Sequence, residues 1–388
     1  MSLPLGDAQR RRLHESFAAL CAIPSVTGDE RACADWISGQ LRAMGLEVSE
    51  DLAGQSLGGN AGNLLARIPG TGNRMLLLCA HMDTVPLSAE LEPVREAGGW
   101  TNAGDGILGA DNKSAVAALV ELARILCAAP APPNVGVELL FTVAEETGLQ
   151  GASQFDASQL QSGFGYVFDH ASPWGEIIAA SPTHVRLDAE FRGCAAHAGM
   201  APEQGVSAVM AAARGVAALP QGRLDPQTTA NVGVIHGGVA TNVVADRCSV
   251  AAELRSVDEQ RVQELVTQAL DALQDAADSG GCDLDVSVER LFSGYRLDAR
   301  EPSVALAERA LRRLGLNPRM VSTGGGSDAN ALRAMGFQCT NIANGTERPH
   351  ERTERVSDEA LETGLAMLLA LIEEAADAPS GASGSAGR

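Results

Sequence analysis

Apolar runs alternate with helix-like segments through the first part of the chain. A continuous apolar run bounded by turn residues is typical of a strand that is buried on both faces. Residues 63–68, 75–80, 135–144 and 166–169 have this pattern. Residues 113–129 (KSAVAALVELARILCAA) instead repeat their apolar positions at helical spacing. The alternation predicts an α/β fold in which helices cover a sheet.

A different rhythm begins near residue 180. Up to about residue 290 the pattern predicts the order strand, helix, strand, strand, helix, strand, which is ferredoxin-like. Because α/β character then returns, we expect residues 180–290 to be a domain inserted into one formed by residues 1–179 and 291–376. The Gly- and Ser-rich residues 377–388 are expected to be a disordered tail.

Composition and charge limit the possible functions. A chain of 388 residues exceeds what one hydrophobic core usually supports, which also favours two domains. The formal net charge of −20 would repel nucleic acid and anionic membrane surfaces, so neither is expected as a partner. The 8 cysteines show no zinc-like spacing, and no apolar run suits a signal peptide or a membrane span. We therefore expect a cytoplasmic protein with reduced cysteines.

Polar side chains follow several of the predicted strands. The run LLLCAHMDTVP (76–86) places His81 and Asp83 at the end of one strand, and other strands end at Glu145-Glu146 and at Asp169. In open α/β sheets, ligands bind outside the carboxyl ends of the strands. The pattern therefore predicts that these side chains meet at one edge of the sheet.

Two further candidates lie beside this set. Asp111 (GILGADNKS) precedes the helix at 113, and His350 (NGTERPHERTE) follows another predicted strand. Each candidate also has a purely structural interpretation. Asp111 could cap its helix, His350 could belong to a charged surface, and the remaining acids could be solvated at the starts of loops. These interpretations are open for each residue taken alone.

Taken together, two histidines and several acids at one edge would repel without a cation. Zinc binds histidine nitrogen and carboxylate oxygen, and two-metal hydrolases hold a pair of ions. Five protein ligands, one of them a shared carboxylate, would be enough for two ions. Three carboxylates and one hydroxide would balance the charge of the two ions. Glu145 would then be free to act as a base, and Asp83 could orient the His81 imidazole through its other nitrogen.

The motifs around these residues resemble one known family, the dinuclear zinc peptidases that include peptidase T, glutamate carboxypeptidases and aminoacylases. The resemblance covers nearly the whole chain and is strongest to the peptidase T-like branch. The motifs that show this resemblance are, in chain order, AHMDTVP, GILGADNKSAVA, TVAEETGLQGA, YVFD, AAHAGMAPEQGVSA, ATNVVAD, ELRS and TGGGSDANAL. It implies a catalytic domain with a mixed sheet flanked by helices and an inserted ferredoxin-like lid that also forms a homodimer.

The resemblance implies a role for each metal-site residue. His81 and Asp169 would hold one zinc ion, Glu146 and His350 the other, and Asp111 would bridge them. Cobalt or manganese could replace zinc. Glu145 would be the general base that deprotonates a water bridging the ions and passes the proton to the leaving amine. The peptide bond after Asp111 is often cis in this family.

The resemblance also implies substrate-binding residues, mostly in the inserted domain. His197 (AAHAG) would reach the partner subunit's site and stabilise the oxyanion. Asn242 and Arg255 would bind carbonyl or carboxylate groups, and Gly325 in TGGGSDAN could cradle a carboxylate with its backbone N–H. From the residues alone, His197 could be an ordinary loop histidine, Arg255 a salt-bridge residue and the glycine run a tight turn.

The implied function is hydrolysis of an amide bond in a small peptide, as a tripeptide aminopeptidase. Two alternatives remain open: hydrolysis of N-acyl or N-carbamoyl amino acids, or a catalytically inactive relative that acts as a binding protein. Two positions depart from the family pattern. Asn112 follows Asp111 where many relatives have a second acid, and His350 is separated from Glu354 by unusually charged residues.

Overall fold

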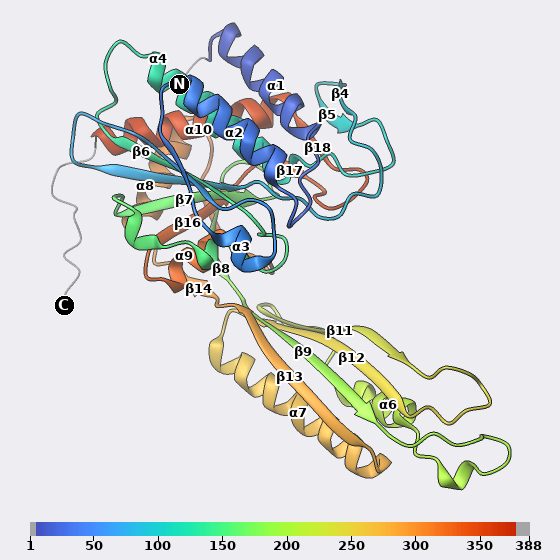
Figure 1. Cartoon of the computed structure of the whole chain (residues 1–388). Coiled ribbons are helices and arrows are strands. Elements are labelled where there is room, and N and C mark those ends of the chain that lie inside the picture. Colours follow the sequence, from blue (N-terminus) through green and yellow to red (C-terminus); the bar gives the residue numbers. More distant parts are fainter. Residues whose placement is uncertain (1–4, 378–388) are drawn as a thin grey trace. The chain divides into compact units, whose positions relative to one another are not determined.

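The computed structural model describes residues 5–377, which form two compact units (Figure 1). The larger unit contains the described residues up to Ala179, then Leu297–Val321 and the described residues from Ser327 onward. The smaller unit contains Ala180–Arg296 and Ser322–Gly326. None of the described helices is both long enough and apolar enough to cross a lipid bilayer.

Most strands of a mixed 9-stranded sheet belong to the larger unit, in agreement with the predicted fold. Its strands are hydrogen-bonded in the order β1-β2-β6-β3-β7-β16-β8-β14, and β15 pairs with β8. β3 is parallel to β6 and β7, and β7 is parallel to β16, whereas β2 and β8 run antiparallel to their neighbours. The bounds are β1 (Val48–Glu50), β2 (Leu64–Ile68), β3 (Met75–His81), β6 (Gly136–Thr142), β7 (Phe164–His170), β8 (Glu176–Ser181), β14 (Tyr295–Arg296), β15 (Arg319–Ser322) and β16 (Gln338–Ala343).

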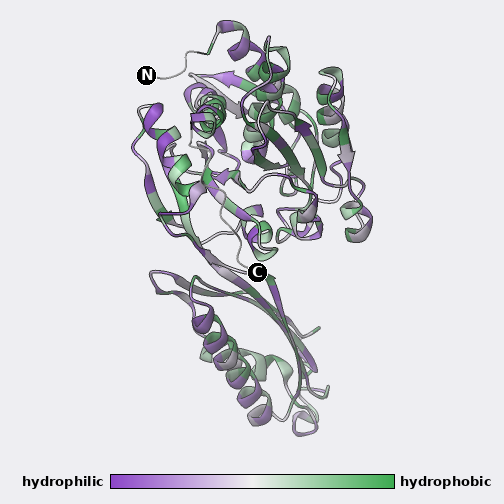
Figure 2. Ribbon diagram, turned by 90° about the vertical axis from the view of Figure 1, so that its left-hand side faces the viewer, coloured by the Kyte–Doolittle hydropathy of each residue, from purple (hydrophilic) through white to green (hydrophobic). Residues whose placement is uncertain are grey.

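The central strands β3 and β6 are buried on both faces, which explains their continuous apolar sequences. Leu77 and Leu78 on β3 and Leu139, Leu140 and Phe141 on β6 are each 0% exposed. In Figure 2 the hydrophobic colour gathers in the strands of this sheet. Because both faces are covered, a site open to a ligand is expected at the ends of these strands.

Helices cover both faces of this sheet. The long helix α4 packs on β3 and β7 and is itself flanked by α1, α2 and α10, while the short helices α3, α5 and α9 lie on the opposite side (Figure 1). The helix predicted at 113–129 is thus confirmed as α4. The bounds are α1 (Asp7–Cys21), α2 (Arg31–Ala43), α3 (Ala53–Leu57), α4 (Ala110–Ala128), α5 (Gln150–Gln154), α8 (Pro302–Arg313), α9 (Asp328–Ala334) and α10 (Asp358–Asp377).

The end of α10 corrects the predicted start of the tail. Asp377 is the last residue of α10, so the helix includes the first residue that we assigned to the tail. The rest of that predicted tail, residues 378–388, lies outside the described residues.

A second, four-stranded sheet in the larger unit was not expected from the sequence. Its order is β17-β18-β5-β4, formed by β4 (Pro93–Glu96), β5 (Gly99–Asn102), β17 (Thr346–Glu347) and β18 (Arg355–Ser357). Strands of two to four residues are too short to show a period in the sequence. The sheet matters for the site because the connection from β17 to β18 carries His350.

The smaller unit is an antiparallel sheet of 5 strands in the order β10-β11-β12-β9-β13, with α6 and α7 packed on it. Without β10, this is the predicted ferredoxin-like arrangement. In Figure 2, α7 carries both hydrophilic and hydrophobic colours, as expected for a helix with one buried face. The bounds are β9 (Thr183–Arg192), α6 (Ala208–Ala218), β10 (Gly222–Asp225), β11 (Thr228–Gly237), β12 (Arg247–Ser256), α7 (Glu259–Gly280) and β13 (Asp283–Phe292).

Candidate metal centre

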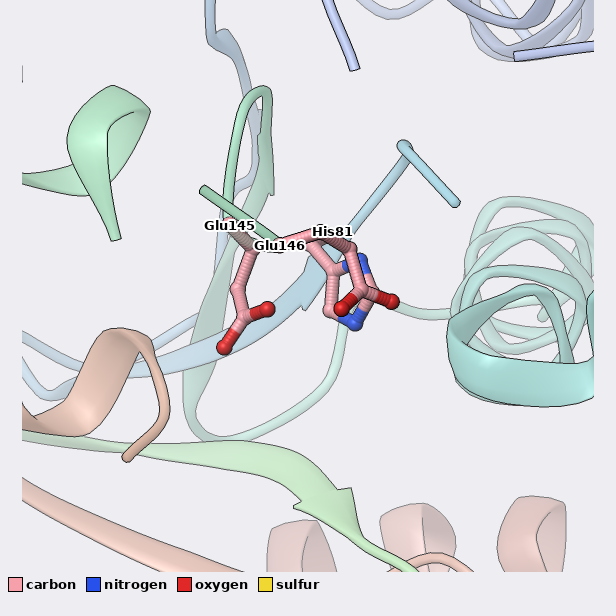
Figure 3. Close-up of side chains that lie close together, drawn as sticks. All are labelled: His81, Glu145 and Glu146. Atoms are coloured by element: carbon pink, nitrogen blue, oxygen red, sulfur yellow. The ribbon is translucent and has the colours of Figure 1, made fainter. Parts of the chain in front are cut away.

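Three of the predicted site residues follow two neighbouring parallel strands. His81 ends β3 opposite Thr142, the last residue of β6, and Glu145 and Glu146 come shortly after β6. Figure 3 shows their side chains close together at this edge of the sheet. One ligand atom from each of the three lies within 4.8 Å of the other two. The imidazole of His81 is almost completely buried, at 1% exposure.

Asp111, at the start of α4, lies between the two histidines. Its Oδ1 is 3.5 Å from His81 Nε2 and its Oδ2 is 3.6 Å from His350 Nε2. His81 Nε2 is also 3.5 Å from Asp169 Oδ1, and His350 Nε2 is 3.0 Å from Glu146 Oε1. The structure therefore brings all five predicted metal ligands together, and Asp111 is shared between the two halves of the cluster.

Asp83 organises the backbone beneath this cluster. Its carboxylate accepts hydrogen bonds from the backbone N–H of Glu145 (3.0 Å) and of Glu146 (3.2 Å), and from Thr27 Oγ1 (2.6 Å). Its backbone carbonyl lies 3.0 Å from His81 Nδ1, closer than its carboxylate at 3.4 Å. If Nδ1 donates to this carbonyl, Nε2 of His81 is left free to face the acids.

Burial and crowding change the pKa values of the acids. Burial, followed by the charge of Asp169, raises the pKa of Glu145 well above its ordinary value. Burial also raises the pKa of Glu146 and of Asp169. Although burial opposes the charged form of Asp111 too, His81 and His350 hold its pKa below the ordinary value. The carboxylates therefore compete for two positive imidazoles.

The histidines respond in the opposite direction. Burial would lower the pKa of His81, but Asp169 and Asp111 raise it well above the ordinary value. The hydrogen bond with Glu146 raises the pKa of His350 to about 9. Both imidazoles thus serve as cations for the surrounding acids. A bound divalent ion would take over this role and favour the neutral imidazole, which is the form that binds metals.

The residues of this cluster fit a pair of divalent cations. Imidazole nitrogen and carboxylate oxygen are the donors that zinc uses. They form overlapping groups, of which one contains His81, Asp111 and Asp169 and another contains Asp111, Glu146 and His350. The buried Oδ1 of Asp111 makes no hydrogen bond of ordinary length with any described residue, so it is available to a cation.

The sequence interpretation did not assign three buried residues beside the cluster. Asp328, at the start of α9, accepts a hydrogen bond from Thr142 Oγ1, and burial raises its pKa to about 7. Glu354 accepts hydrogen bonds from the backbone N–H of Gly109 and of Asp111, and burial raises its pKa to about 7. Both acids lie in motifs that the sequence singled out, so their position was a usable signal.

Lys113 is the third of these residues and lies one turn into α4. It is 0% exposed, and its Nζ donates a hydrogen bond of 2.6 Å to the carbonyl of Ile23. Burial lowers the pKa of Lys113. Because Lys113 stands among apolar residues of the helix, the hydrophobic period of this segment did not indicate it as a site residue. The Asp111–Asn112 peptide, which precedes it, is cis, as the family resemblance implied.

The predicted substrate-binding residues all belong to the smaller unit, and their described contacts are made there. His197 and Asn242 are exposed, and His197 Nδ1 accepts hydrogen bonds from the backbone N–H of Gly199 and of Met200, both at 3.2 Å. The ring proton of His197 is therefore on Nε2. The carbonyl of Asn242 accepts a hydrogen bond from Ala198 N (2.9 Å), which ties the two motifs together.

Arg255 and Gly325 already have partners within the smaller unit. The Arg255 guanidinium forms a two-point contact with Glu253 (3.2 and 2.9 Å) and also donates to the carbonyl of Gly324 (3.1 Å). Hydrogen bonds from His184 and Arg255 lower the pKa of Glu253 to about 2, so Arg255 faces a permanent negative charge. The N–H of Gly325 donates to Thr323 Oγ1 at 3.1 Å.

Comparison with known proteins identifies the family. The model of peptidase family M20/M25/M40 matches residues 77–374. The crystal structure of aminopeptidase PepT from Bacillus cereus ATCC 10987 is 34% identical, with a TM-score of 0.85, over 95% of this chain and 99% of that one. A tripeptidase from Staphylococcus aureus is 33% identical, with a TM-score of 0.89, over 95% and 98% of the two chains.

A curated relative of unassigned activity also matches nearly the whole chain. The uncharacterized protein YqjE of Bacillus subtilis (strain 168) is 34% identical over 367 residues, which are 94% of this chain and 99% of that protein. Family model, structures and relative all match most of the chain, and the motifs that carry the resemblance lie inside the matched region. The chain therefore belongs to peptidase family M20/M25/M40.

Proposed function

We propose that this peptidase is a dinuclear zinc aminopeptidase that releases the first residue of small peptides, tripeptides in particular. The observation that carries the proposal is the meeting of His81, Asp111, Glu146, Asp169 and His350, with Asp111 shared, at the carboxyl edge of the sheet. The relatives described as an aminopeptidase and a tripeptidase, at 34% and 33% identity over 95% of the chain, support the choice of substrate.

In this proposal the ligands are divided between two ions. His81 and Asp169 would hold one ion, Glu146 and His350 would hold the other, and Asp111 would be shared between them. When bound, two Zn²⁺ ions, or Co²⁺ or Mn²⁺ in their place, would polarise the peptide carbonyl and lower the pKa of a water molecule. Asp83 supports this arrangement, since it holds the backbone of Glu146 and lies beside His81 Nδ1.

Glu145 is proposed as the general base. Its carboxyl group takes a proton from the attacking water and then gives that proton to the nitrogen of the leaving amine. Burial and the nearby acids, Asp169 first, raise the pKa of Glu145, which favours its acceptance of a proton. The hydrogen bond from the backbone N–H of Glu145 to Asp83 holds the backbone from which this side chain extends.

The substrate contacts are proposed from the family resemblance. His197, whose Nε2 carries the proton, would donate a hydrogen bond to the oxyanion, and Asn242 would bind a substrate carbonyl. Arg255 and Gly325 are proposed to line the carboxylate end of the peptide. Since Glu253 already neutralises Arg255, we expect Arg255 to orient a substrate carboxylate rather than to supply most of the affinity for it.

We also propose that residues 180–290 act as a lid and pair two subunits into a homodimer. The support is an open strand edge. β10 pairs only with Thr228–Ala230 of β11, and within the described residues no strand covers the same edge at Asn231–Gly237. Val234 and Ile235, 54% and 49% exposed, lie on this stretch. An exposed strand edge with apolar residues is a template for pairing with a second chain.

Mass spectrometry of the reaction products tests the function. Zinc-loaded and cobalt-loaded protein is incubated with free tripeptides, free dipeptides and the N-acetylated forms of both. Release of the first residue from free-amine tripeptides alone is the expected result. Cleavage of acetylated substrates alone would refute the aminopeptidase proposal in favour of an N-acyl amino-acid hydrolase. No turnover of any amide by metal-loaded protein would favour a binding protein.

The cytoplasmic location stays a prediction, supported by the free cysteines.

A further inference from the structure

Glu354 is a buried acid that no step of the proposed reaction uses. It is 1% exposed and lies at the end of the connection from β17 to β18. Both of its oxygens are engaged by backbone amides of one short segment. Oε2 accepts a hydrogen bond from Gly109 N at 2.7 Å, and Oε1 accepts one from Asp111 N at 2.9 Å. The side chain of Glu354 is therefore joined to this segment at two points, Gly109 and Asp111.

Glu354 connects two distant segments that each supply a ligand of the centre. The bond to Asp111 spans 243 residues of sequence. Asp111 is the carboxylate shared between the two halves of the cluster, and His350 lies in the same connection as Glu354. A hydrogen bond of 3.0 Å from the N–H of Glu354 to the carbonyl of Glu351 closes that connection into a turn. The position of one histidine is thus tied to the backbone of the shared acid.

The segment at Gly109 also has a charged side chain on its other side. Gly109 has φ = 74°, a left-handed conformation that favours glycine, and it begins the turn into α4. A Cβ at Gly109 would lie 3.7 Å from Lys113 Nζ, so this buried ammonium lies directly against the turn. The turn is therefore held between a buried cation in α4 and the carboxylate of Glu354.

Glu354 is not itself placed to bind an ion. None of the groups whose ligand atoms gather within 4.8 Å includes it among the described residues. Its oxygens face N–H donors, whereas the oxygens of Asp111 face the two histidines at 3.5 and 3.6 Å. A residue with this pattern acts through the ligand that it holds.

We propose that Glu354 is a positioning residue of the metal centre. It fixes the backbone of Asp111 relative to His350, so that the two carboxylate oxygens of Asp111 point to separate ions. This inference rests on the proposed dinuclear function, because it requires that the cluster hold two ions. Without Glu354, the ion shared by Asp111, Glu146 and His350 should be held more weakly, since two of its ligands would lose their common support.

The test compares Glu354→Gln with Glu347→Gln in the full chain. Both replace a carboxylate by an amide in the same region, but Glu347 is exposed and lies before His350. The glutamine at 354 keeps one acceptor and turns an NH₂ group toward a backbone N–H. Metal-free protein is titrated with Co²⁺, followed by calorimetry and visible absorption, to obtain the number of ions and the affinity of each. Hydrogen–deuterium exchange of the metal-free protein reports on the backbone at residues 108–112.

For Glu354→Gln we expect the second ion to bind about 10- to 100-fold more weakly, the range typical of residues that support metal ligands. Exchange at 108–112 should be faster than in the wild type. Glu347→Gln should match the wild type in both measurements. A Glu354→Gln protein that binds both ions with wild-type affinity would overturn the inference, even if it unfolds at a lower temperature, because Glu354 would then be only a structural acid.

A third variant covers the case in which Glu354→Gln does not fold. Glu354→Asp keeps the carboxylate but withdraws it by one methylene group, and the same loss of affinity for the second ion, though smaller, is expected. Wild-type affinity for both ions in Glu354→Asp would overturn the inference. A wild-type protein that binds fewer than two ions would instead refute the dinuclear function, and the inference with it.

Discussion

Replacing Glu145 by Gln is the sharpest test of the proposed chemistry. Glutamine has nearly the same size and shape as glutamate but cannot accept and return a proton. The side-chain carboxylate of Glu145 makes none of the hydrogen bonds found among residues 5–377, and the bond from its backbone N–H to Asp83 does not depend on the side chain. The substitution should therefore remove the base and leave the surrounding contacts in place.

The size of the effect follows from the role. A general base contributes about 10²- to 10⁴-fold to the rate, which is about 3–5 kcal/mol of activation free energy at 1.36 kcal/mol per factor of ten. The loss should be in kcat. The five proposed ligands, among them the adjacent Glu146, are unchanged, so both ions should remain bound.

The stability of the metal-free variant should move in the other direction. Burial and the charge of Asp169 raise the pKa of Glu145 in the folded protein. A carboxyl group with a raised pKa in the folded state destabilises the fold above its unfolded pKa, and this penalty disappears as the pH falls through the folded pKa. Removing this ionisable group should therefore keep or raise the unfolding temperature at neutral pH.

Three measurements decide the matter: steady-state kinetics on a free tripeptide, metal content by mass spectrometry, and thermal unfolding without metal. Glu347→Gln serves as the control, since it removes an exposed acid of the same unit. Full activity of Glu145→Gln with both ions bound would refute the assignment of the base. Loss of an ion in this variant would show instead that Glu145 is a ligand, in line with its nearness to His81 and Glu146.

Further predictions concern the ligands and their support. Asp111→Asn should weaken the binding of both ions at least about 10-fold and abolish turnover, as measured by native mass spectrometry and kinetics; retention of two tightly bound ions would contradict the shared role. Asp83→Ala removes the acceptor of the hydrogen bonds from Thr27 Oγ1 and from the backbone N–H of Glu145 and Glu146. Urea unfolding should therefore show that the free energy of unfolding falls by about 3 kcal/mol. A fall below about 1 kcal/mol would contradict the central place of Asp83. A chelator should abolish peptidase activity and added Zn²⁺ or Co²⁺ should restore it; activity that persists in metal-free protein would rule out a metal-dependent reaction. The pKa of His350 is raised from 6.5 to about 9, so the stabilisation of the metal-free fold by its contact with Glu146 is complete below about pH 6.5 and is lost as the pH rises through about 9. Over this interval the unfolding temperature of metal-free His350→Ala should fall less than that of the metal-free wild type. Equal slopes of unfolding temperature against pH would refute the contribution of the pair.

Some elements of the fold could be predicted because their patterns are long and periodic. The buried run of β3 and the helical repeat of α4 extend over 7 and 19 residues, enough to show their period without any neighbour. The order of elements in the smaller unit could be predicted for the same reason. Three of the ligands, His81, Glu146 and Asp169, could be proposed because parallel strands end at the same edge of a sheet, so residues at such ends come together whatever their distance in sequence.

The short elements and the supporting contacts could not be predicted in this way. β17 and β18 have two and three residues, too few for a period, yet they fix the connection that carries His350. Glu253, two residues before Arg255 on β12, holds the Arg255 guanidinium, in line with the salt-bridge interpretation that the sequence left open for Arg255. The contact between Glu354 and the backbone of Asp111, by contrast, joins residues 243 apart in the sequence, so no local pattern encodes it.

The sequence by itself determined the α/β class and the ferredoxin-like unit, because hydrophobic period is a property of single segments. It also supplied the predicted set of metal ligands, through their side-chain chemistry and the family resemblance. Only the tertiary structure decided how that set is oriented. His350 meets Glu146 across 204 residues, and Glu354 meets the Asp111 amide across 243. These contacts form only when the folded chain brings the two segments together. The burial of the whole core determines where each segment lies, whereas the residues that meet do not.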